Sequence, residues 1–204
     1  MIDTPQEFRL QALRSGITSL TSVCYTHAHA DHIFGIDDLR VFSKEKKLQV
    51  YGDEETISVI AETFGYIFSG RNSGGGIPSL ELHNIAEKAP YIGEHRVMHI
   101  PVQHGCRTIT GYRVGPFGYI TDCSGLPEQS IEMLKGLDVL VIGALRYRTH
   151  PTHWNVQQAL EMAETLSPRL AYFTHMCHDI DHDQLESMLP DGISPAYDGL
   201  TLEL

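Results

Sequence analysis

Four short apolar runs in this chain each end in a histidine or an aspartate. The cluster His27–His32 follows SLTSVCYT, His104 ends VMHIPVQH, Asp122 ends FGYITD and His175 ends LAYFTH. Runs of this length that are rich in Val, Ile and Tyr predict buried strands. Because open α/β sheets place their binding crevices at the carboxyl ends of strands, we expect the polar endings to converge on one site.

Strand-like runs alternate with helical patterns in the rest of the chain. LQVYGD precedes an amphipathic helix over residues 54–68, a glycine-dense surface loop follows over 69–78, and three antiparallel strands are expected over 95–122. The loop suits either the mouth of a cleft or a plain connection. Later helices are expected after LPEQS, over 153–166 and near DQLESML, and later strands over 138–145, 170–175 and 199–204. This alternation predicts a single α/β domain over residues 1–204.

The charge of the chain restricts its partners. Its 204 residues include 26 acidic and 15 basic side chains, which gives a formal net charge of −11. Such a balance disfavours nucleic acids and anionic membranes. No apolar run reaches the roughly 20 residues of a membrane-spanning helix, and the first residues lack the apolar segment of a signal peptide. We therefore expect a cytoplasmic protein with a small-molecule partner and no membrane partner.

The cysteines are few and scattered, which predicts reduced thiols rather than a disulfide framework. Each lies within three residues of a candidate metal ligand, so a sulfur ligand is an alternative to simple packing at strand ends. Packing is the preferred interpretation. The residues are Cys24, Cys106, Cys123 and Cys177.

The segment HAHADH has a spacing suited to two metal ions. In an extended segment His27 and His29 share one face, whereas the adjacent Asp31 and His32 must diverge unless the chain turns. Imidazole and carboxylate bind zinc, manganese or iron, and hydrolytic two-metal sites hold their ions roughly 3.5–4 Å apart. A carboxylate such as Asp122 has two oxygens with which to bridge them. Isolated histidines are interpreted instead as ordinary core or surface residues, namely His83, His95, His99 and His182.

THAHADH followed by His104, Asp122 and His175 resembles the signature of metallo-β-lactamase-fold hydrolases. The resemblance implies an α/β fold, a metallo-β-lactamase-like αβ/βα four-layer sandwich with its site at one edge. It also implies two divalent ions, zinc or manganese first and iron as an alternative. One ion would be held by His27, His29 and His104, the other by Asp31, His32 and His175, with Asp122 bridging them.

A narrower resemblance lies in HADHIFGIDDLR, YITDCSG, HPTHWNVQQAL, THMCHD and AYDGL. These segments are similar to the phosphodiesterase branch, particularly the cyclic-phosphate phosphodiesterases of phosphonate breakdown. The implied activity is hydrolysis of a small or cyclic phosphodiester by metal-bound hydroxide. The branch is more distantly similar to tRNA 3′-end processing nucleases, but the acidic charge and the lack of a basic insertion disfavour that function.

The amino terminus departs from the family pattern, because the segment IDTP follows Met1 directly instead of an earlier group of strands. The resemblance therefore implies an amino-terminally shortened sandwich with an exposed sheet edge, which a homodimer could cover. His178 matches a structural-zinc histidine of the family, but the cysteine partners of that histidine are absent.

Two residues are expected to take part in catalysis besides binding, Asp31 and His153. A helix is expected to begin near His153 with Thr152 as its cap, and a helix amino terminus suits a phosphate. The resemblance implies that His153 contacts the phosphoryl oxygen or protonates the leaving group, which its near-neutral pKa suits. His150 precedes a proline and is interpreted as a turn residue.

Three aspartates near these motifs have weaker assignments. Asp37 and Asp38 are candidates to hydrogen-bond the ligand histidines, or else form an ordinary acidic helix face. Asp198 belongs to the family-like carboxyl-terminal segment, and no role follows from its position.

Two other functions fit the same metal ligands. The site could hydrolyse an acyl substrate such as a lactone, thioester or β-lactam, for which an apolar pocket would be expected. Alternatively the chain could be a non-catalytic metal-binding module.

Overall fold

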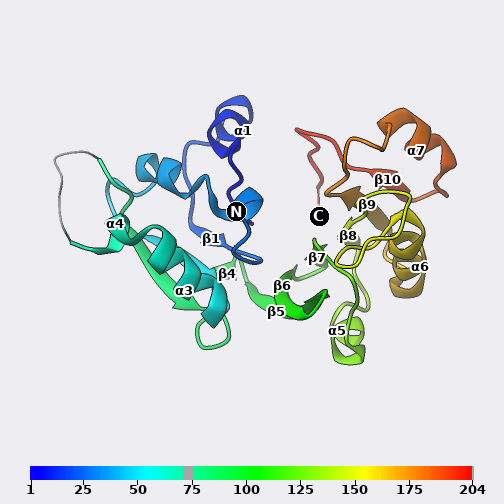
Figure 1. The fold of residues 1–204 in the computed structure, drawn as a ribbon, viewed down its shortest axis with the longest axis horizontal. Helices are drawn as coiled ribbons and strands as arrows, with labels where there is room; N and C mark the ends of the chain where they lie inside the picture. The colour runs from blue at the N-terminus through cyan, green and yellow to red at the C-terminus, as the bar shows by residue number, and fades with distance from the viewer. Residues whose placement is uncertain (71–75, 204) are drawn as a thin grey trace. The chain divides into compact units, whose positions relative to one another are not determined.

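The computed structural model describes residues 1–70 and 76–203 and divides the chain into two compact units, Met1–Pro90 and Tyr91–Leu204 (Figure 1). Residues 71–75 of the expected glycine-dense loop lie outside the described residues.

The first unit is built on a parallel sheet of three strands in the order β1-β2-β3. Its strands are β1 (Ser22–Cys24), β2 (Leu48–Gly52) and β3 (Leu80–Asn84). Its helices are α1 (Phe8–Arg14), α2 (Ala30–Ile33), the 3₁₀-helix η1 (Ile36–Val41), α3 (Glu54–Thr63) and α4 (Gly65–Phe68). β1 and β2 occur where the apolar runs predicted them, whereas β3 was not predicted.

The expected helix over residues 54–68 is interrupted. Asp53 caps α3 by accepting a hydrogen bond from the backbone N–H of Thr56 at 2.7 Å, and the helix packs against β2 and β3 (Figure 1). At Phe64 the backbone leaves the helical region, with φ −107° and ψ 36°, and α4 begins only at the next residue. The single predicted helix is therefore two shorter ones.

The core of the first unit fixes the segment that follows the histidine motif. Ile33, Ile36 and Leu39 are at most 1% exposed and belong to the same cluster as Val23 and Val50 of the sheet. Burying such side chains stabilises the fold by roughly 1.5–3 kcal/mol each. The backbone that carries His27–His32 is thus held at both ends, by β1 and by the buried residues of α2 and η1.

The second unit contains a seven-stranded mixed sheet in the order β10-β9-β8-β7-β6-β5-β4. The β5-β6-β7 section is antiparallel, as predicted, and β7-β8-β9-β10 is parallel. The strands are β4 (Tyr91–Ile92), β5 (His95–His104), β6 (Arg107–Val114), β7 (Phe117–Ile120), β8 (Val139–Gly143), β9 (Leu170–Thr174) and β10 (Ile193–Pro195), and the helices are α5 (Glu128–Met133), α6 (Val156–Leu166) and α7 (His182–Met188).

Two sequence predictions about the second unit are wrong. Helix α6 begins at Val156 rather than near His153, because Asn155 and Gln158 form a reciprocal capping box that starts the helix there. No strand is assigned to the described residues from Gly199 to Glu203, and the last strand of the sheet is β10 instead.

Among the described residues, none of the helices has both the length and the apolar character needed to cross a membrane.

Candidate functional site

The first unit gathers the four ligand-type residues of HAHADH. The backbone is extended at His29, which precedes α2, and the ring of His32 in α2 lies with its centroid 4.2 Å from that of His27. Nε2 of His27 lies 2.9 Å from Nδ1 of His29, and Nε2 of His32 lies 3.5 Å from a carboxylate oxygen of Asp31. Two nitrogens on one tetrahedral zinc lie about 3.4 Å apart, given Zn–N bonds of about 2.0–2.1 Å. The spacing of these side chains therefore fits metal binding.

A buried carboxylate, Asp3, orients this motif. Its Oδ2 lies 2.7 Å from Nδ1 of His32 and accepts a hydrogen bond from Oγ1 of Thr26 at 2.8 Å, while its Oδ1 accepts from the Thr26 backbone N–H at 2.8 Å. An ionised carboxylate only accepts, so Nδ1 of His32 carries the proton and Nε2 is its ligand nitrogen.

Thr26 extends the same arrangement to His27. The hydroxyl of Thr26 gives its only proton to Asp3, so it accepts a hydrogen bond from Nδ1 of His27 at 3.1 Å. His27 therefore also presents Nε2 as its ligand nitrogen. Both rings are 5% exposed, which leaves little rotational freedom for either.

Of the two alternatives for Asp37 and Asp38, the structure supports the acidic helix face and not the orientation of the histidines. Asp37 accepts hydrogen bonds from Arg40 at 2.6 Å and from the hydroxyl of Tyr66 at 2.7 Å, and Asp38 lies 4.0 Å from Arg40. The orienting carboxylate is Asp3, which the sequence reasoning missed although the segment IDTP had been singled out.

The second unit gathers His104, Asp122, His153 and His175. Asp122 lies two residues beyond β7 and is 2% exposed. Its Oδ1 lies 3.3 Å from Nδ1 of His175, and its Oδ2 lies 3.1 Å from Nε2 of His153. Potential ligand atoms of Asp122, His153 and His175 all lie within 4.8 Å of one another.

His104 is oriented by backbone carbonyls. Its Nδ1 lies 2.7 Å from the carbonyl oxygen of Asp122 and 2.9 Å from that of Thr152. Carbonyl oxygens only accept, so Nδ1 of His104 carries the proton and Nε2 is the ligand nitrogen. The residues of both units thus fit divalent metal ions, because three histidines have an Nδ1–H held by the protein, as metal-bound imidazoles usually do.

The backbone at three of these residues is strained. Asp3, Asp122 and His175 have φ values of 53°, 52° and 57°, and in the described part of the chain only Ser167 joins them as a non-glycine residue with positive φ. Such conformations cost on the order of 1–3 kcal/mol each and collect at functional sites. Asp122 and His175 adopt them just beyond the ends of β7 and β9, where the chain must turn to present the side chain.

The loop before α6 carries His150, Thr152 and His153. Oγ1 of Thr152 lies 2.8 Å from Nδ1 of His153 and 3.2 Å from Nδ1 of His150. The ring of His153 is stacked on that of His175, with centroids 5.3 Å apart and an interplanar angle of 8°. His153 therefore lies beside the candidate ligands without being at a helix amino terminus, and the anion-binding argument based on that terminus does not hold.

The cysteines divide into two groups. Cys24 and Cys123 are buried, and burial raises the pKa of both thiols, that of Cys24 to about 12. Cys106 is exposed and Cys177 is half-buried. None of the four cysteines forms a disulfide, and the candidate metal groups among the described residues contain no cysteine. Packing therefore accounts for Cys24 and Cys123, as predicted.

The remaining histidines occupy other environments. His83 lies 2.6 Å from Oε1 of Gln49 on the first sheet, and the side chain of His178 is 95% exposed beside Asp179. His182 forms a group with Asp183 and Glu186 on α7, which the sequence analysis did not anticipate, and the two acidic residues of that group are exposed.

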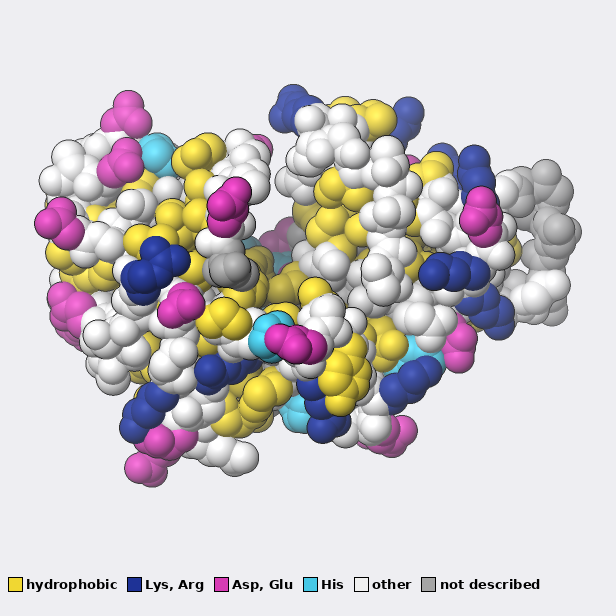
Figure 2. Space-filling model, turned by 180° about the vertical axis from the view of Figure 1, so that it is seen from behind, with side chains coloured by type: hydrophobic (Ala, Val, Ile, Leu, Met, Phe, Trp, Pro, Cys, Tyr) yellow, Lys and Arg dark blue, Asp and Glu magenta, His cyan; other side chains and the backbone are white. Residues whose placement is uncertain are grey.

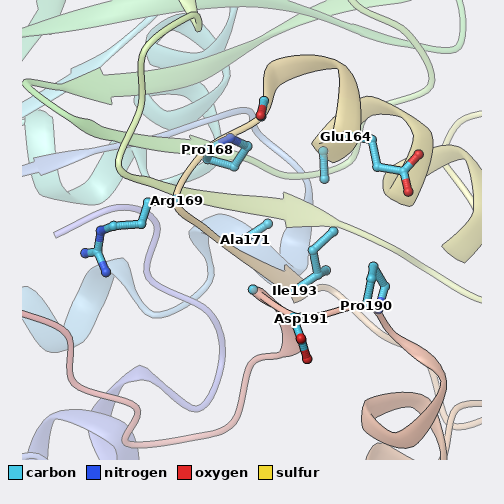
Figure 3. Close-up of a pocket in the computed structure, with 10 residues that line it drawn as sticks. Glu164, Pro168, Arg169, Ala171, Pro190, Asp191 and Ile193 are labelled. Atoms are coloured by element: carbon cyan, nitrogen blue, oxygen red, sulfur yellow. The ribbon is translucent and has the colours of Figure 1, made fainter.

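A pocket of about 220 Å³ in the second unit is lined by none of the candidate ligands (Figure 3). It is lined by the end of α6, by Arg169 and Ala171 at the start of β9, and by residues 190–193. His175 follows the opposite end of β9, so this pocket and His175 lie at opposite ends of that strand. Figure 2 shows one face of the molecule, on which Lys and Arg side chains lie among Asp and Glu and form no continuous basic patch.

Comparisons with known proteins show the family of this chain. A family model described as a β-lactamase superfamily domain matches residues 1–176. A solved structure described as a new diphosphatase from the PhnP family is 39% identical, covers 100% of this chain and 79% of its own, and superposes with a TM-score of 0.90. The metallo-β-lactamase-fold protein YhfI from Bacillus subtilis is 18% identical, with coverages of 98% and 85% and a TM-score of 0.74, which shows the fold alone.

A curated relative from Porphyromonas gingivalis named octanoyltransferase is 34% identical over 203 residues. The match covers 98% of this chain but 41% of that relative, so the chain spans less than half of its length. Together these findings confirm the predicted family and fold: the chain belongs to the β-lactamase superfamily, as a metallo-β-lactamase-fold, metal-dependent hydrolase near the PhnP branch.

Proposed function

We propose that this protein binds two divalent metal ions and hydrolyses a small phosphodiester or diphosphate. The proposed ligands are His27, His29 and His104 for one ion, Asp31, His32 and His175 for the other, and Asp122 as the bridge. Zinc and manganese are the preferred ions, because the ligand set mixes imidazole and carboxylate. Ions bound there would lower the pKa of a bound water and offset negative charge on the phosphoryl oxygens.

The observation that carries this proposal is the orientation of the histidine rings. His32 and His27 are held by Asp3 and Thr26, and His104 is held by backbone carbonyls, so each ring presents Nε2 as its ligand nitrogen. Metal-bound imidazoles usually have their other ring nitrogen held by the protein in this way, so Nε2 can be used for binding. Metal coordination is the use that family membership supports.

A phosphorus centre is favoured as the target by the solved relative described as a diphosphatase, which is 39% identical over the whole chain. In the proposed reaction a water oxygen forms a bond to phosphorus and the bond from phosphorus to the leaving oxygen breaks. Asp31, whose side chain is 62% exposed, accepts a proton from the water, and His153 gives a proton from Nε2 to the leaving oxygen. His153 suits this role because Nε2 lies 3.1 Å from Oδ2 of Asp122, the proposed bridge.

Acyl transfer or hydrolysis is the second candidate, because the curated relative carries the name octanoyltransferase. The same ligands would suit an acyl carbonyl. The chain spans 41% of that relative, however, so the activity named for the whole protein is not specific to the matched part. We therefore rank a phosphorus substrate first. The single-domain organisation, the cytoplasmic location and the homodimer remain predictions.

A metal analysis joined to a substrate panel tests the proposal. The purified chain would be assayed with bis-p-nitrophenyl phosphate, a cyclic nucleotide, a dinucleoside diphosphate, an acyl thioester and a chromogenic β-lactam, with Asp122→Asn as the control for contaminating hydrolases. We expect two metal equivalents and turnover of a phosphorus ester that Asp122→Asn lacks. Turnover of the thioester or lactam alone would favour the acyl candidate, and full metal content without any turnover would favour a binding module.

A further inference from the structure

The loop between β8 and α6 contains a polar network that includes His150, for which the sequence predicted only a turn. Nδ1 of His150 lies 3.3 Å from the backbone nitrogen of Thr152 and 3.1 Å from Nδ1 of His153. Nδ1 of His153 also lies 2.8 Å from the Thr152 hydroxyl. All three residues belong to the second unit, so these distances are internal to it.

The donors in this network can be assigned. A backbone N–H only donates, so Nδ1 of His150 is an acceptor for Thr152, and its neutral ring carries the hydrogen on Nε2. Burial is the largest cause that lowers the pKa of His150, and the nearby His153, Arg146 and His104 lower it further. The lowered pKa favours the neutral ring. Because Nδ1 of His150 accepts, Nδ1 of His153 must be the donor in the contact between the two rings.

We propose that His150 is a positioning residue for His153: by accepting a hydrogen bond at Nδ1, it fixes the His153 ring so that Nε2 faces Asp122. This inference rests on the proposed role of His153 as the proton donor. A histidine that acts as a general acid needs one ring nitrogen that the protein holds and another that exchanges the proton. In a Ser-His-Asp triad, the aspartate carboxylate holds one nitrogen of the histidine in this way. Here a neutral imidazole takes the place of that carboxylate.

The surroundings of the network limit its movement. Gly105 packs so closely against Thr152 that a Cβ at this glycine would lie 2.8 Å from Cγ2 of the threonine. Two backbone carbonyls of the same loop accept hydrogen bonds from Arg146, those of Arg148 at 3.3 Å and Thr149 at 2.8 Å. The backbone on both sides of His150 is thus held in place, which is what a positioning residue requires.

Substitutions at His150 separate positioning from general structure. His150→Asn places its amide oxygen near the position of Nδ1 and keeps an acceptor there, whereas His150→Gln places its amide near the position of Nε2. We expect His150→Ala and His150→Gln to lose about 10-fold or more in kcat toward an alkyl phosphodiester, but no more than the 10²–10⁴-fold loss expected when the positioned acid itself is removed. His150→Asn should restore most of that rate, and KM and metal content should not change.

Comparing substrates with different leaving groups distinguishes a positioning role from a loss of folding, because a loss of folding would lower kcat toward every substrate. p-Nitrophenolate departs without a proton, so His150→Ala should retain most of its kcat toward bis-p-nitrophenyl phosphate. The double variant His150→Ala/His153→Ala should be no slower than His153→Ala alone, because both changes remove the same step. His95→Ala, at an exposed histidine of the same unit, is the matched control and should match the unsubstituted protein.

The outcomes distinguish this inference from the proposed function. If His153→Ala loses activity toward the alkyl ester while His150→Ala does not, the positioning role is wrong and the proposed function stands. Equal activity of His150→Asn and His150→Ala, or multiplied losses in the double variant, would also overturn the positioning role. If His153→Ala itself keeps full activity, the proposed proton donor is wrong, and the inference about His150 is wrong with it.

Discussion

Oδ2 of Asp3 lies 2.7 Å from Nδ1 of His32, a contact between buried side chains that are 29 positions apart in the chain. The same carboxylate accepts two hydrogen bonds from Thr26, so one acidic residue near the amino terminus fixes the rings of His32 and, through Thr26, His27. Residues outside the HAHADH motif therefore determine which nitrogen each ring of the motif presents.

Replacing Asp3 by alanine should weaken metal binding. Without the carboxylate, Nδ1 of His32 loses its acceptor and the ring can rotate or change tautomer. Loss of such an orienting group costs about 10–100-fold in metal affinity. Competition with a chromogenic chelator measures this change. The matched control is Asp37→Asn, whose carboxylate pairs with Arg40 and Tyr66, and it should bind metal as the unsubstituted protein does. Equal weakening by both substitutions would argue against a specific role for Asp3.

His153→Ala should separate metal binding from catalysis. We expect unchanged metal content and a loss of roughly 10²–10⁴-fold in kcat toward an ester with a poor leaving group, the usual range for a positioned acid. Elemental analysis and initial rates on the same preparation provide the two readouts. Loss of metal together with activity would indicate that His153 is a ligand rather than a proton donor.

Gly35 should not accept a side chain. A Cβ at this glycine would lie 2.3 Å from the carbonyl oxygen of Pro5 and 2.7 Å from Cβ of Phe8, so Gly35→Ala must displace the segment that follows Asp3. Overpacking of this kind costs about 1–3 kcal/mol, and urea unfolding measures it.

Gly65→Ala is the control for this substitution. Nothing lies within 4 Å of a Cβ at Gly65, which is the first residue of α4, so alanine there should be neutral or stabilising by up to about 1 kcal/mol. If Gly35→Ala is as stable as Gly65→Ala, the close approach between Gly35 and Pro5 has no energetic consequence.

Thiol reactivity should distinguish the cysteines. Burial raises the pKa of Cys24 to about 12 and also raises that of Cys123, so at pH 8 neither forms the reactive thiolate to any extent. Cys106 is exposed and should react with Ellman's reagent first, followed by the half-buried Cys177. Cys106→Ser should remove the fast phase. A fast phase that persists in this variant would place a reactive thiol elsewhere.

The sequence predicted those parts of the fold that depend on local pattern. Apolar runs with a polar residue at the end located β1, β5, β7 and β9, and the same ends identified the candidate ligands. Strand β3 was missed because only Leu80 of its five residues is buried, so it lacks the continuous apolar run of a central strand. The start of α6 was misplaced because both Thr152 and Asn155 can cap a helix, and only the structure shows the capping box at Asn155.

The sequence predicted which residue types would be metal ligands, but not the contacts that orient their side chains. The contact between Asp3 and His32 joins distant parts of the chain, and no periodicity reports such a contact. The positive φ values of Asp122 and His175 likewise have no signature in sequence, since most residues avoid that conformation and these two are held there by their surroundings. The sequence predicts only a turn at His150, because the contacts of this residue depend on the path of the whole loop.

Anomalous diffraction from crystals of the metal-loaded protein tests the central claim most directly, because it locates the ions and their ligands together. The account predicts two anomalous peaks roughly 3.5–4 Å apart, with His27, His29 and His104 around one, Asp31, His32 and His175 around the other, and Asp122 bound to both. A single peak, or two peaks of which neither lies at Asp122, would contradict it.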